Sequence, residues 1–262
     1  MIMGQKKNDF FFQNDQIWQV FPANSLKNWV IGLRDKSKKT ACWVRLSDHM
    51  QPFAPYFSDW WWGIADVTDP YLYVHAYQDP GLPVTKGCYT YEIATGNLLW
   101  EHPAYYFIGQ TESGVILKDA KGMHHAVDRL TGAIVTSMSE PPDAAMRYWN
   151  AKRSPAYCTP TIWIEQSEAF QHWQLALKKQ FSLVLAYQIE QIDYQNATYL
   201  YVYEKGVGKE LKGSLIYWPH QDSPYILLQH QVSGLSTASF FIHDSVLAVL
   251  KTPQQLQLIS LT

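Results

Sequence analysis

A five-residue turn that occurs twice constrains this chain more than any other feature. The sequence EIATG at residues 92–96 is matched by DRLTG at 128–132, so the two Thr-Gly pairs lie 36 residues apart. In each copy, the acidic side chain can bond backbone N–H groups just ahead of it, and glycine can take the positive φ that lets one strand fold back as the next. A period of about 35–45 residues is typical of the four-stranded blades of a β-propeller.

The composition favours an all-β fold. Aromatic residues make up 15% of the 262-residue chain, whereas charged residues make up only 17%. Large flat side chains fill the space between packed sheets and favour strands over helices. A closed β architecture commonly reaches this length without splitting. We therefore expect one propeller domain over residues 15–262, preceded by a disordered or loosely attached tail at residues 1–14.

The repeat predicts two consecutive blades, and a third is expected later in the chain. Each consists of four short apolar runs separated by turn residues. The runs are Trp60–Val67, Tyr71–Gln78, Gly87–Ala94 and Asn97–Glu101; then Tyr106–Gln110, Gly114–Asp119, Met123–Asp128 and Ala133–Met138; and later Phe181–Ile192, Thr198–Glu204, Gly213–Pro219 and Tyr225–Gln231. Strands are also expected at Ile17–Phe21, Asn28–Asp35 and Thr40–Asp48.

Residues 140–180 leave the number of blades open. The repeat gives way there to a Pro-rich connection and two expected strands, Thr161–Glu165 and His172–Lys178. The second of these could instead belong to a short helix, because its residues do not alternate strictly. The count is six blades if this region forms a degenerate blade and five if it is an insertion. We expect five to seven blades and favour six.

The end of the chain lacks one strand of a blade. Only three strands are expected there, Ala238–His243, Ser245–Lys251 and Gln255–Leu261. The segment 15–23 is similar to 97–104, because both place a Trp shortly before Pro-Ala. We therefore expect the N-terminal strand Ile17–Phe21 to pair beside Gln255–Leu261. This pairing would close the propeller and remove two exposed sheet edges.

The sequences of the two repeats resemble those of a known family. YEIATGNLLWE at 91–101 and AVDRLTGAIV at 126–135 resemble the PQQ-type repeats of quinoprotein-like propellers, and the chain is similar in length to uncharacterised bacterial propeller families. In the enzymes of that superfamily, the resemblance implies a quinone held by a vicinal disulfide or a stacking Trp above calcium-ligating carboxylates. This chain has no adjacent cysteines and fewer repeats. We therefore expect the fold without the quinone, and no other cofactor.

Charge and terminal composition exclude several classes of protein. A net charge of −2 and a pI near 6.5 do not provide the clustered basic residues that nucleic-acid binding requires. The N-terminal apolar run is too short for a signal peptide or a membrane span, which favours a cytoplasmic protein without a transmembrane segment. Cys42, Cys88 and Cys158 are far apart in sequence and are interpreted as buried thiols.

The candidate ligand-binding residues are Trp60, Trp62, His75 and His124. Trp60 and Trp62 flank Trp61 at the start of a blade, near the central channel, where they can be core residues or a platform for a sugar or peptide. His124 and His125 are adjacent, so strand alternation turns them to opposite faces and they cannot bind one ion together. We expect no metal site.

The sequence contains no signature of a known enzyme class. Nucleophile-elbow, P-loop and dinucleotide-binding patterns are absent, and close pairs of acids such as Asp66 and Asp69 fit turn chemistry better than acid–base catalysis. The leading hypothesis is a non-catalytic binding or scaffold propeller that holds a protein or small ligand. The alternative is an enzyme, or a carbohydrate- or small-ligand-binding protein, that uses the central funnel.

Overall fold

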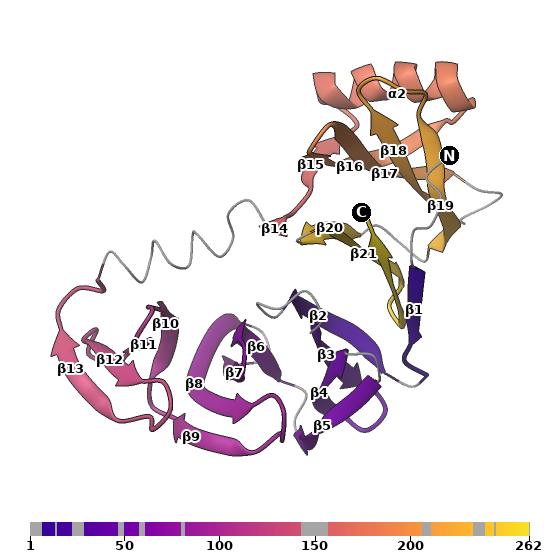
Figure 1. Ribbon diagram of the computed structural model, residues 1–262. Helices are drawn as coiled ribbons and strands as arrows, with labels where there is room; N and C mark the ends of the chain where they lie inside the picture. Colours follow the sequence, from indigo (N-terminus) through magenta and orange to yellow (C-terminus); the bar gives the residue numbers. More distant parts are fainter. Residues whose placement is uncertain are drawn as a thin grey trace. The chain divides into compact units, whose positions relative to one another are not determined.

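The computed structural model describes residues 7–13, 15–22, 29–46, 50–57, 61–79, 82–142, 157–205, 211–232, 239–243 and 245–261. The chain divides into two compact units, one of residues 12–154 and the other of residues 1–11 with 155–262. Both units are built from antiparallel sheets, and the described residues contain one helix among many strands (Figure 1). The expectation of a mostly β protein is therefore confirmed.

Three four-stranded antiparallel meanders form the unit of residues 12–154. The second and third meanders are linked by a parallel bridge between Gly87 and Tyr106. The strands are β2 (Gln16–Pro22), β3 (Trp29–Asp35), β4 (Thr40–Leu46) and β5 (Met50–Phe57); β6 (Trp62–Thr68), β7 (Tyr71–Asp79), β8 (Leu82–Glu92) and β9 (Leu98–His102); and β10 (Tyr106–Gln110), β11 (Gly114–Lys118), β12 (His124–Asp128) and β13 (Ile134–Met138). Of these, only β5 was not expected, because two prolines interrupt the alternation of its residues.

The repeated turns have the geometry that the sequence predicts. The glycines that end them have φ values of 73° and 72°. Asp128 Oδ1 accepts hydrogen bonds of 2.7 Å from both the backbone N–H and the hydroxyl of Thr131. Glu92, which is one methylene longer, accepts a 2.6 Å bond from the hydroxyl of Thr95. The two copies of the repeat, at 92–96 and 128–132, therefore specify their own turns through local hydrogen bonds.

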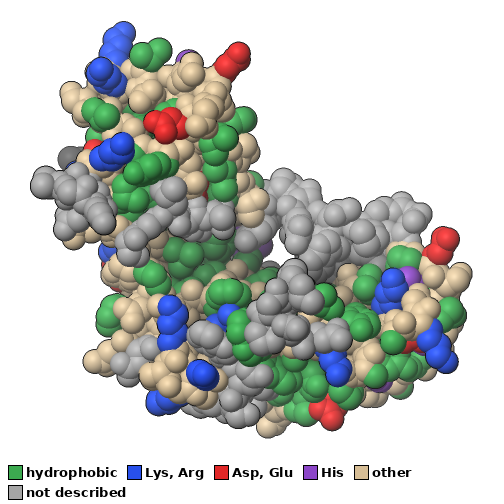
Figure 2. Space-filling view, turned by 180° about the vertical axis from the view of Figure 1, so that it is seen from behind, with side chains coloured by type: hydrophobic (Ala, Val, Ile, Leu, Met, Phe, Trp, Pro, Cys, Tyr) green, Lys and Arg blue, Asp and Glu red, His purple; other side chains and the backbone are tan. Residues whose placement is uncertain are grey.

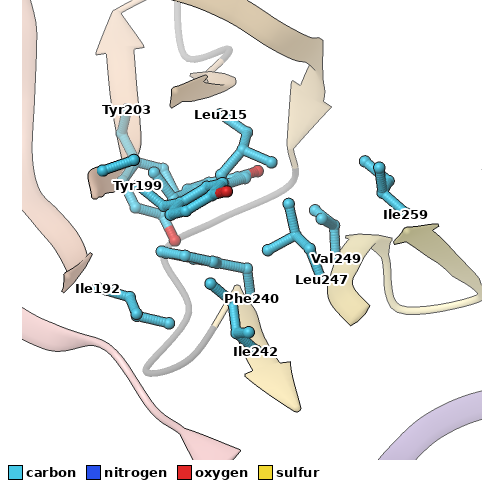
Figure 3. Packing of buried hydrophobic residues seen from close by; sticks show 11 residues of the cluster. Ile192, Tyr199, Tyr203, Leu215, Phe240, Ile242, Leu247, Val249 and Ile259 are labelled. Carbon is cyan, nitrogen blue, oxygen red and sulfur yellow. The ribbon is translucent and has the colours of Figure 1, made fainter. Parts of the chain in front are cut away.

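Two five-stranded antiparallel sheets form the other unit. Their strand orders are β15-β16-β17-β18-β19 and β1-β22-β21-β20-β14. The strands are β15 (Thr161–Ile164), β16 (Leu185–Tyr194), β17 (Ala197–Lys205), β18 (Leu211–Pro219) and β19 (Tyr225–Val232), with β1 (Lys7–Phe11), β14 (Tyr157–Cys158), β20 (Phe240–His243), β21 (Val246–Thr252) and β22 (Gln255–Ser260). Tyr203 and Leu215 of the first sheet share a buried cluster with Phe240 and Leu247 of the second (Figure 3).

A helix covers the other face of the β15–β19 sheet. Helix α2 (Glu168–Phe181) begins at Ser167, whose side chain accepts a hydrogen bond from the backbone N–H of Phe170. Phe170 and Leu177 are fully buried against this sheet. The strand expected at His172–Lys178 is therefore wrong and the helical alternative is confirmed, because the apolar residues recur at helical spacing. Residues 143–156 of the uncertain region lie outside the described residues.

The N-terminal strand that joins the C-terminal sheet is β1, not Ile17–Phe21. β1 pairs antiparallel with β22, placing Lys7 opposite Ile259, and so residues 7–11 of the expected tail form a strand. Ile17–Phe21 lies in β2, which pairs with β3. The predicted partner of Ile17–Phe21 was therefore wrong. The Trp…Pro-Ala similarity identified a real strand but carried no information on its pairing, which long-range packing decides.

Buried and partly buried polar side chains join neighbouring meanders within residues 12–154. The amide of Gln19 in β2 accepts a 2.7 Å hydrogen bond from the backbone N–H of Ile64 in β6 and donates a 3.2 Å bond to its carbonyl. Gln110 in β10 is fully buried and donates to the carboxylate of Asp66 and to the hydroxyl of Thr68, both in β6. Because buried polar groups need partners, these bonds favour one arrangement of β2, β6 and β10.

A comparable connection joins the two sheets of the other unit. Glu190 of β16 is fully buried, and its carboxylate accepts hydrogen bonds from the Tyr203 hydroxyl at 2.8 Å and from the backbone N–H of Ser239 at 2.6 Å. The Ser239 hydroxyl adds a further bond of 2.8 Å. Burial raises the pKa of Glu190, although these hydrogen bonds act in the opposite direction.

Candidate functional site

Trp62 and His75 lie on neighbouring strands of the second meander. Trp62 begins β6, and the next residue, Gly63, is opposite His75 in β7. The Trp62 ring contacts Tyr89 edge-on at a centroid distance of 4.7 Å. Its backbone carbonyl accepts a 3.2 Å hydrogen bond from Nη2 of Arg34. Trp60, the other tryptophan proposed for this site, lies outside the described residues.

A cation–aromatic cluster is the feature of this region that sequence reasoning missed. The guanidinium carbon of Arg34 lies 3.6 Å from the ring centre of Trp18 and 5.7 Å from that of Trp61. Arg34 is buried, whereas Trp18 is 51% exposed. These residues come from β2, β3 and the start of the second meander, so nothing in their sequence spacing indicates the contact. A cation stacked on indole rings fixes their orientation.

His75 is held neutral beside this cluster. A Cβ at Gly63 would come within 3.0 Å of His75 Nε2, 3.1 Å of the Tyr77 hydroxyl and 3.4 Å of Gln19 Oε1. Within the described residues, His75 Nε2 has no hydrogen-bond partner. Burial lowers the pKa of His75 to about 4. The absence of a side chain at Gly63 therefore lets three polar groups from β2 and β7 come together.

His124 lies on β12 of the third meander, whereas Trp62 and His75 belong to the second. Its Nδ1 is 3.2 Å from the carbonyl oxygen of Ser139. The neighbouring His125 has other partners, Asp119 and Ser137. In the described part of the chain, no three His, Cys, Asp or Glu side chains gather as metal ligands would. The candidate residues thus form two separate groups, of which only Trp62 and His75 are close in the fold.

The three cysteines carry unbridged thiols. Cys42 and Cys88 are buried, as expected, whereas Cys158 is partly exposed. Burial raises the pKa of Cys42 to about 12 and also raises that of Cys88 and Cys158. A thiol with a raised pKa is a poor nucleophile at neutral pH, because the thiolate is the reactive form. These groups are unsuited to covalent catalysis.

Exposed aliphatic side chains occur on the outer strands of the second and third meanders, β9 and β13, and in the turn that precedes β13. β9 meets the turn at 128–132 directly, since Trp100 Nε1 donates a 2.8 Å hydrogen bond to the carbonyl of Arg129 and the Trp100 ring packs on Gly132. Val135 is 71% exposed and Leu130 64%. We call this set the outer-strand patch; its members are Leu98, Leu99, Leu130, Ile134 and Val135.

Charged side chains do not gather in one region of the visible surface. In Figure 2, Lys and Arg side chains and Asp and Glu side chains are scattered among hydrophobic and neutral ones. Within the described residues, no helix combines the length and the apolar character needed to cross a membrane.

Comparison with known proteins relates part of the chain to a domain family whose function is unknown. Residues 23–100 match the model of a domain of unknown function (DUF4905). No curated protein matches the chain. The solved structures similar to it include the computationally designed Ika8 protein, which is 11% identical with a TM-score of 0.33. The match covers 93% of this chain and 58% of Ika8.

Two natural proteins are also among the similar structures. BamB from Moraxella catarrhalis is 10% identical, with a TM-score of 0.33, and the match covers 92% of this chain and 84% of BamB. The WD40 domain of Toxoplasma gondii coronin is 6% identical, with a TM-score of 0.28, and the match covers 99% of this chain and 87% of that domain.

Proposed function

We propose that the protein is a binding or scaffold propeller whose outer-strand patch holds a partner protein. Three four-stranded meanders and two five-stranded sheets among the described residues support five blades rather than six. Residues 161–181 add no blade of their own, because β15 pairs within the β15–β19 sheet and α2 packs on that sheet. The pairing of β1 with β22 supports closure of the ring by an N-terminal strand. Proteins with such blades bind partners on their rims and faces.

The outer-strand patch is the observation that carries this proposal. Four exposed aliphatic side chains lie on β9 and β13, a fifth lies in the 128–132 turn, and the contact of Trp100 with that turn brings β9 next to it. Single exposed apolar residues are ordinary, but a contiguous group marks an interaction surface. By contrast, the buried carboxylates Asp66 and Glu190 bond groups inside the fold and are not directed at a ligand.

Site-specific photo-crosslinking tests this surface. A photoreactive amino acid at Val135 or Leu130 should crosslink one defined protein in cells that express the chain. The same group at Lys121, which is exposed outside the patch, is the control. Exchanging Leu99 for Asp should suppress the crosslink from Val135 without changing stability. Equal crosslinking from all three positions, or no effect of Leu99→Asp, would contradict the proposal.

Solution scattering tests the propeller architecture separately. A single compact domain of this length has a radius of gyration of about 18 Å. Two units joined only by a linker would give a clearly larger value. A radius well above this estimate would contradict the closed propeller and would leave the outer-strand patch, which lies within one unit, as a binding surface.

A second candidate function rests on the exposed face of Trp18. Its indole is held by Arg34 and is half exposed, which is the arrangement used to stack sugars and other flat ligands. Ligand binding there should change tryptophan fluorescence in the wild type but not in Trp18→Ala. Leu175→Ala, a change at an exposed site in α2, should leave the response intact. Identical titrations of the wild type and Trp18→Ala would exclude this site.

A further inference from the structure

Three side chains of the third meander form a continuous hydrogen-bonded relay. Nδ1 of His125 lies 2.8 Å from the hydroxyl of Ser137, and Nε2 lies 3.2 Å from Oδ2 of Asp119. His125 and Ser137 face each other across β12 and β13, while Asp119 follows β11. A hydroxyl, an imidazole and a carboxylate bonded in this order are the parts of an activated serine nucleophile.

Each end of the relay has the property that its role requires. Partial burial alone would raise the pKa of Asp119, but hydrogen bonds from His125 and from the backbone N–H groups of Lys121 and Met123 outweigh it and lower the pKa below its usual value. The carboxylate is thus ionised and fixed beside the imidazole. Ser137 is exposed at the opposite end, where a reactant can approach it from solvent.

The position of Ser137 on β13 adds donors for a developing negative charge. Among the described strands, β13 pairs with β12 alone, so it is an edge strand. Alternate backbone N–H groups of an edge strand point away from the sheet without a partner. Such groups stabilise the oxyanion of an acyl-transfer reaction when they lie beside the nucleophile.

We propose that Ser137 is a nucleophile, activated by His125 and oriented by Asp119, that accepts the acyl group of small activated carboxylic esters. The Ser137 oxygen bonds to the ester carbonyl carbon while its proton passes to His125 Nδ1. The ester C–O bond then breaks, and the leaving alcohol takes that proton. Water attacks the acyl-serine in the same way, releasing the carboxylic acid and restoring the hydroxyl. This activity goes beyond partner binding and does not rest on it.

Labelling of the folded full-length protein tests the proposal. The purified protein is treated with 4-nitrophenyl acetate or, separately, with a fluorophosphonate probe, and adducts are located by peptide mass spectrometry. Ser137 should react at least ~100-fold faster than Ser139, which is exposed on the same segment but contacts His124 only through its backbone carbonyl. Ser137→Ala should abolish the adduct, whereas Ser139→Ala should leave its rate unchanged.

Variants of the other two residues separate activation from simple exposure. His125→Gln and Asp119→Asn should slow the labelling of Ser137 by at least ~10-fold, with folding confirmed by circular dichroism. If a variant unfolds, labelling of the wild type with and without denaturant replaces it, because the selectivity for Ser137 must disappear on unfolding. Equal labelling of Ser137 and Ser139, or a rate unaffected by unfolding or by folded variants, would overturn the proposal and leave the relay a structural tie between strands.

Discussion

The ring of Trp100 packs directly on Gly132, so closely that a Cβ at Gly132 would lie 2.6 Å from the indole Cγ. Trp100 belongs to β9 of the second meander and Gly132 to the repeated turn of the third. The indole N–H donates to the carbonyl of Arg129 in the same turn. The repeat motif therefore has two functions: glycine shapes its own turn and also receives the tryptophan of the preceding repeat.

Replacing Gly132 with Ala should destabilise the protein by about 2–4 kcal/mol. The alanine would be forced to a positive φ, and its methyl group would overlap the Trp100 ring. Urea unfolding measures the change. Gly122→Ala is the matched control, because Gly122 also has a positive φ but its Cβ would approach only the end of Lys118, at 3.9 Å. Equal losses in the two variants would show that the Trp100 contact contributes nothing.

Stability should depend on the protonation of His75. Because burial in the folded state lowers the pKa of His75 to about 4 from its usual value of 6.5, the neutral imidazole contributes stability above pH 6.5 that is lost as the pH falls toward 4. The loss is on the order of 3 kcal/mol. Histidine NMR titration should show no imidazolium form of His75 near pH 5.5, and His75→Gln should weaken the acid dependence of unfolding. A His75 that titrates near 6.5 would contradict this environment.

Glu190 should stabilise the protein at low pH, whereas His75 stabilises it at high pH. Its pKa is raised in the folded state, mainly by burial, so its contribution to stability is complete below pH 4.5 and declines as the pH rises through the folded-state pKa. The difference in unfolding free energy between the wild type and Glu190→Gln should therefore shift against the wild type as pH rises. A constant difference from pH 3 to pH 8 would argue against a raised pKa.

Removing β1 should expose the edge of β22. Deletion of residues 1–11 takes away the five pairs from Lys7–Ile259 to Phe11–Gln255, together with the 3.0 Å bonds between Asp9 and Gln257. Backbone amides of β22 should then exchange hydrogen faster, while those of β17 and β18 stay protected. Deletion of residues 1–6 alone serves as the control and should leave β22 unchanged. Unaltered exchange in β22 after the longer deletion would contradict its pairing with β1.

Much of the strand pattern could be predicted because each strand is marked locally, by a short apolar run between turn residues. The runs at 106–110 and 225–231, for example, are rich in apolar and β-branched residues and are bounded by turn residues. The helix was harder to predict, since the apolar residues of 172–178 fit the two-residue period of a strand and the 3.6-residue period of a helix about equally well. β1 was missed because KNDFF mixes charged and aromatic residues without a clear alternation, and its pairing with β22 joins residues about 250 positions apart.

The candidate site was less accessible to such reasoning. Trp62 and His75 came together because they lie on consecutive strands of one hairpin, whereas His124 is in another meander. The Arg34–Trp18 stack had no sequence signal at all. The relay of Asp119, His125 and Ser137 had a weak one, since an acid in the β11–β12 turn and a serine opposite the histidine follow from the hairpin registers once these are known.

Local sequence was sufficient to specify the turns at 92–96 and 128–132, because their acid, threonine and glycine satisfy one another within five residues. Which strands lie beside one another depended on contacts far apart in the chain. The choice of β1 over Ile17–Phe21 as the partner of β22, and the contact of Trp100 with Gly132, follow from the burial of apolar surface and the pairing of polar groups between segments that are distant in sequence. Side-chain patterns within a segment record that a surface is buried, but not which surface covers it.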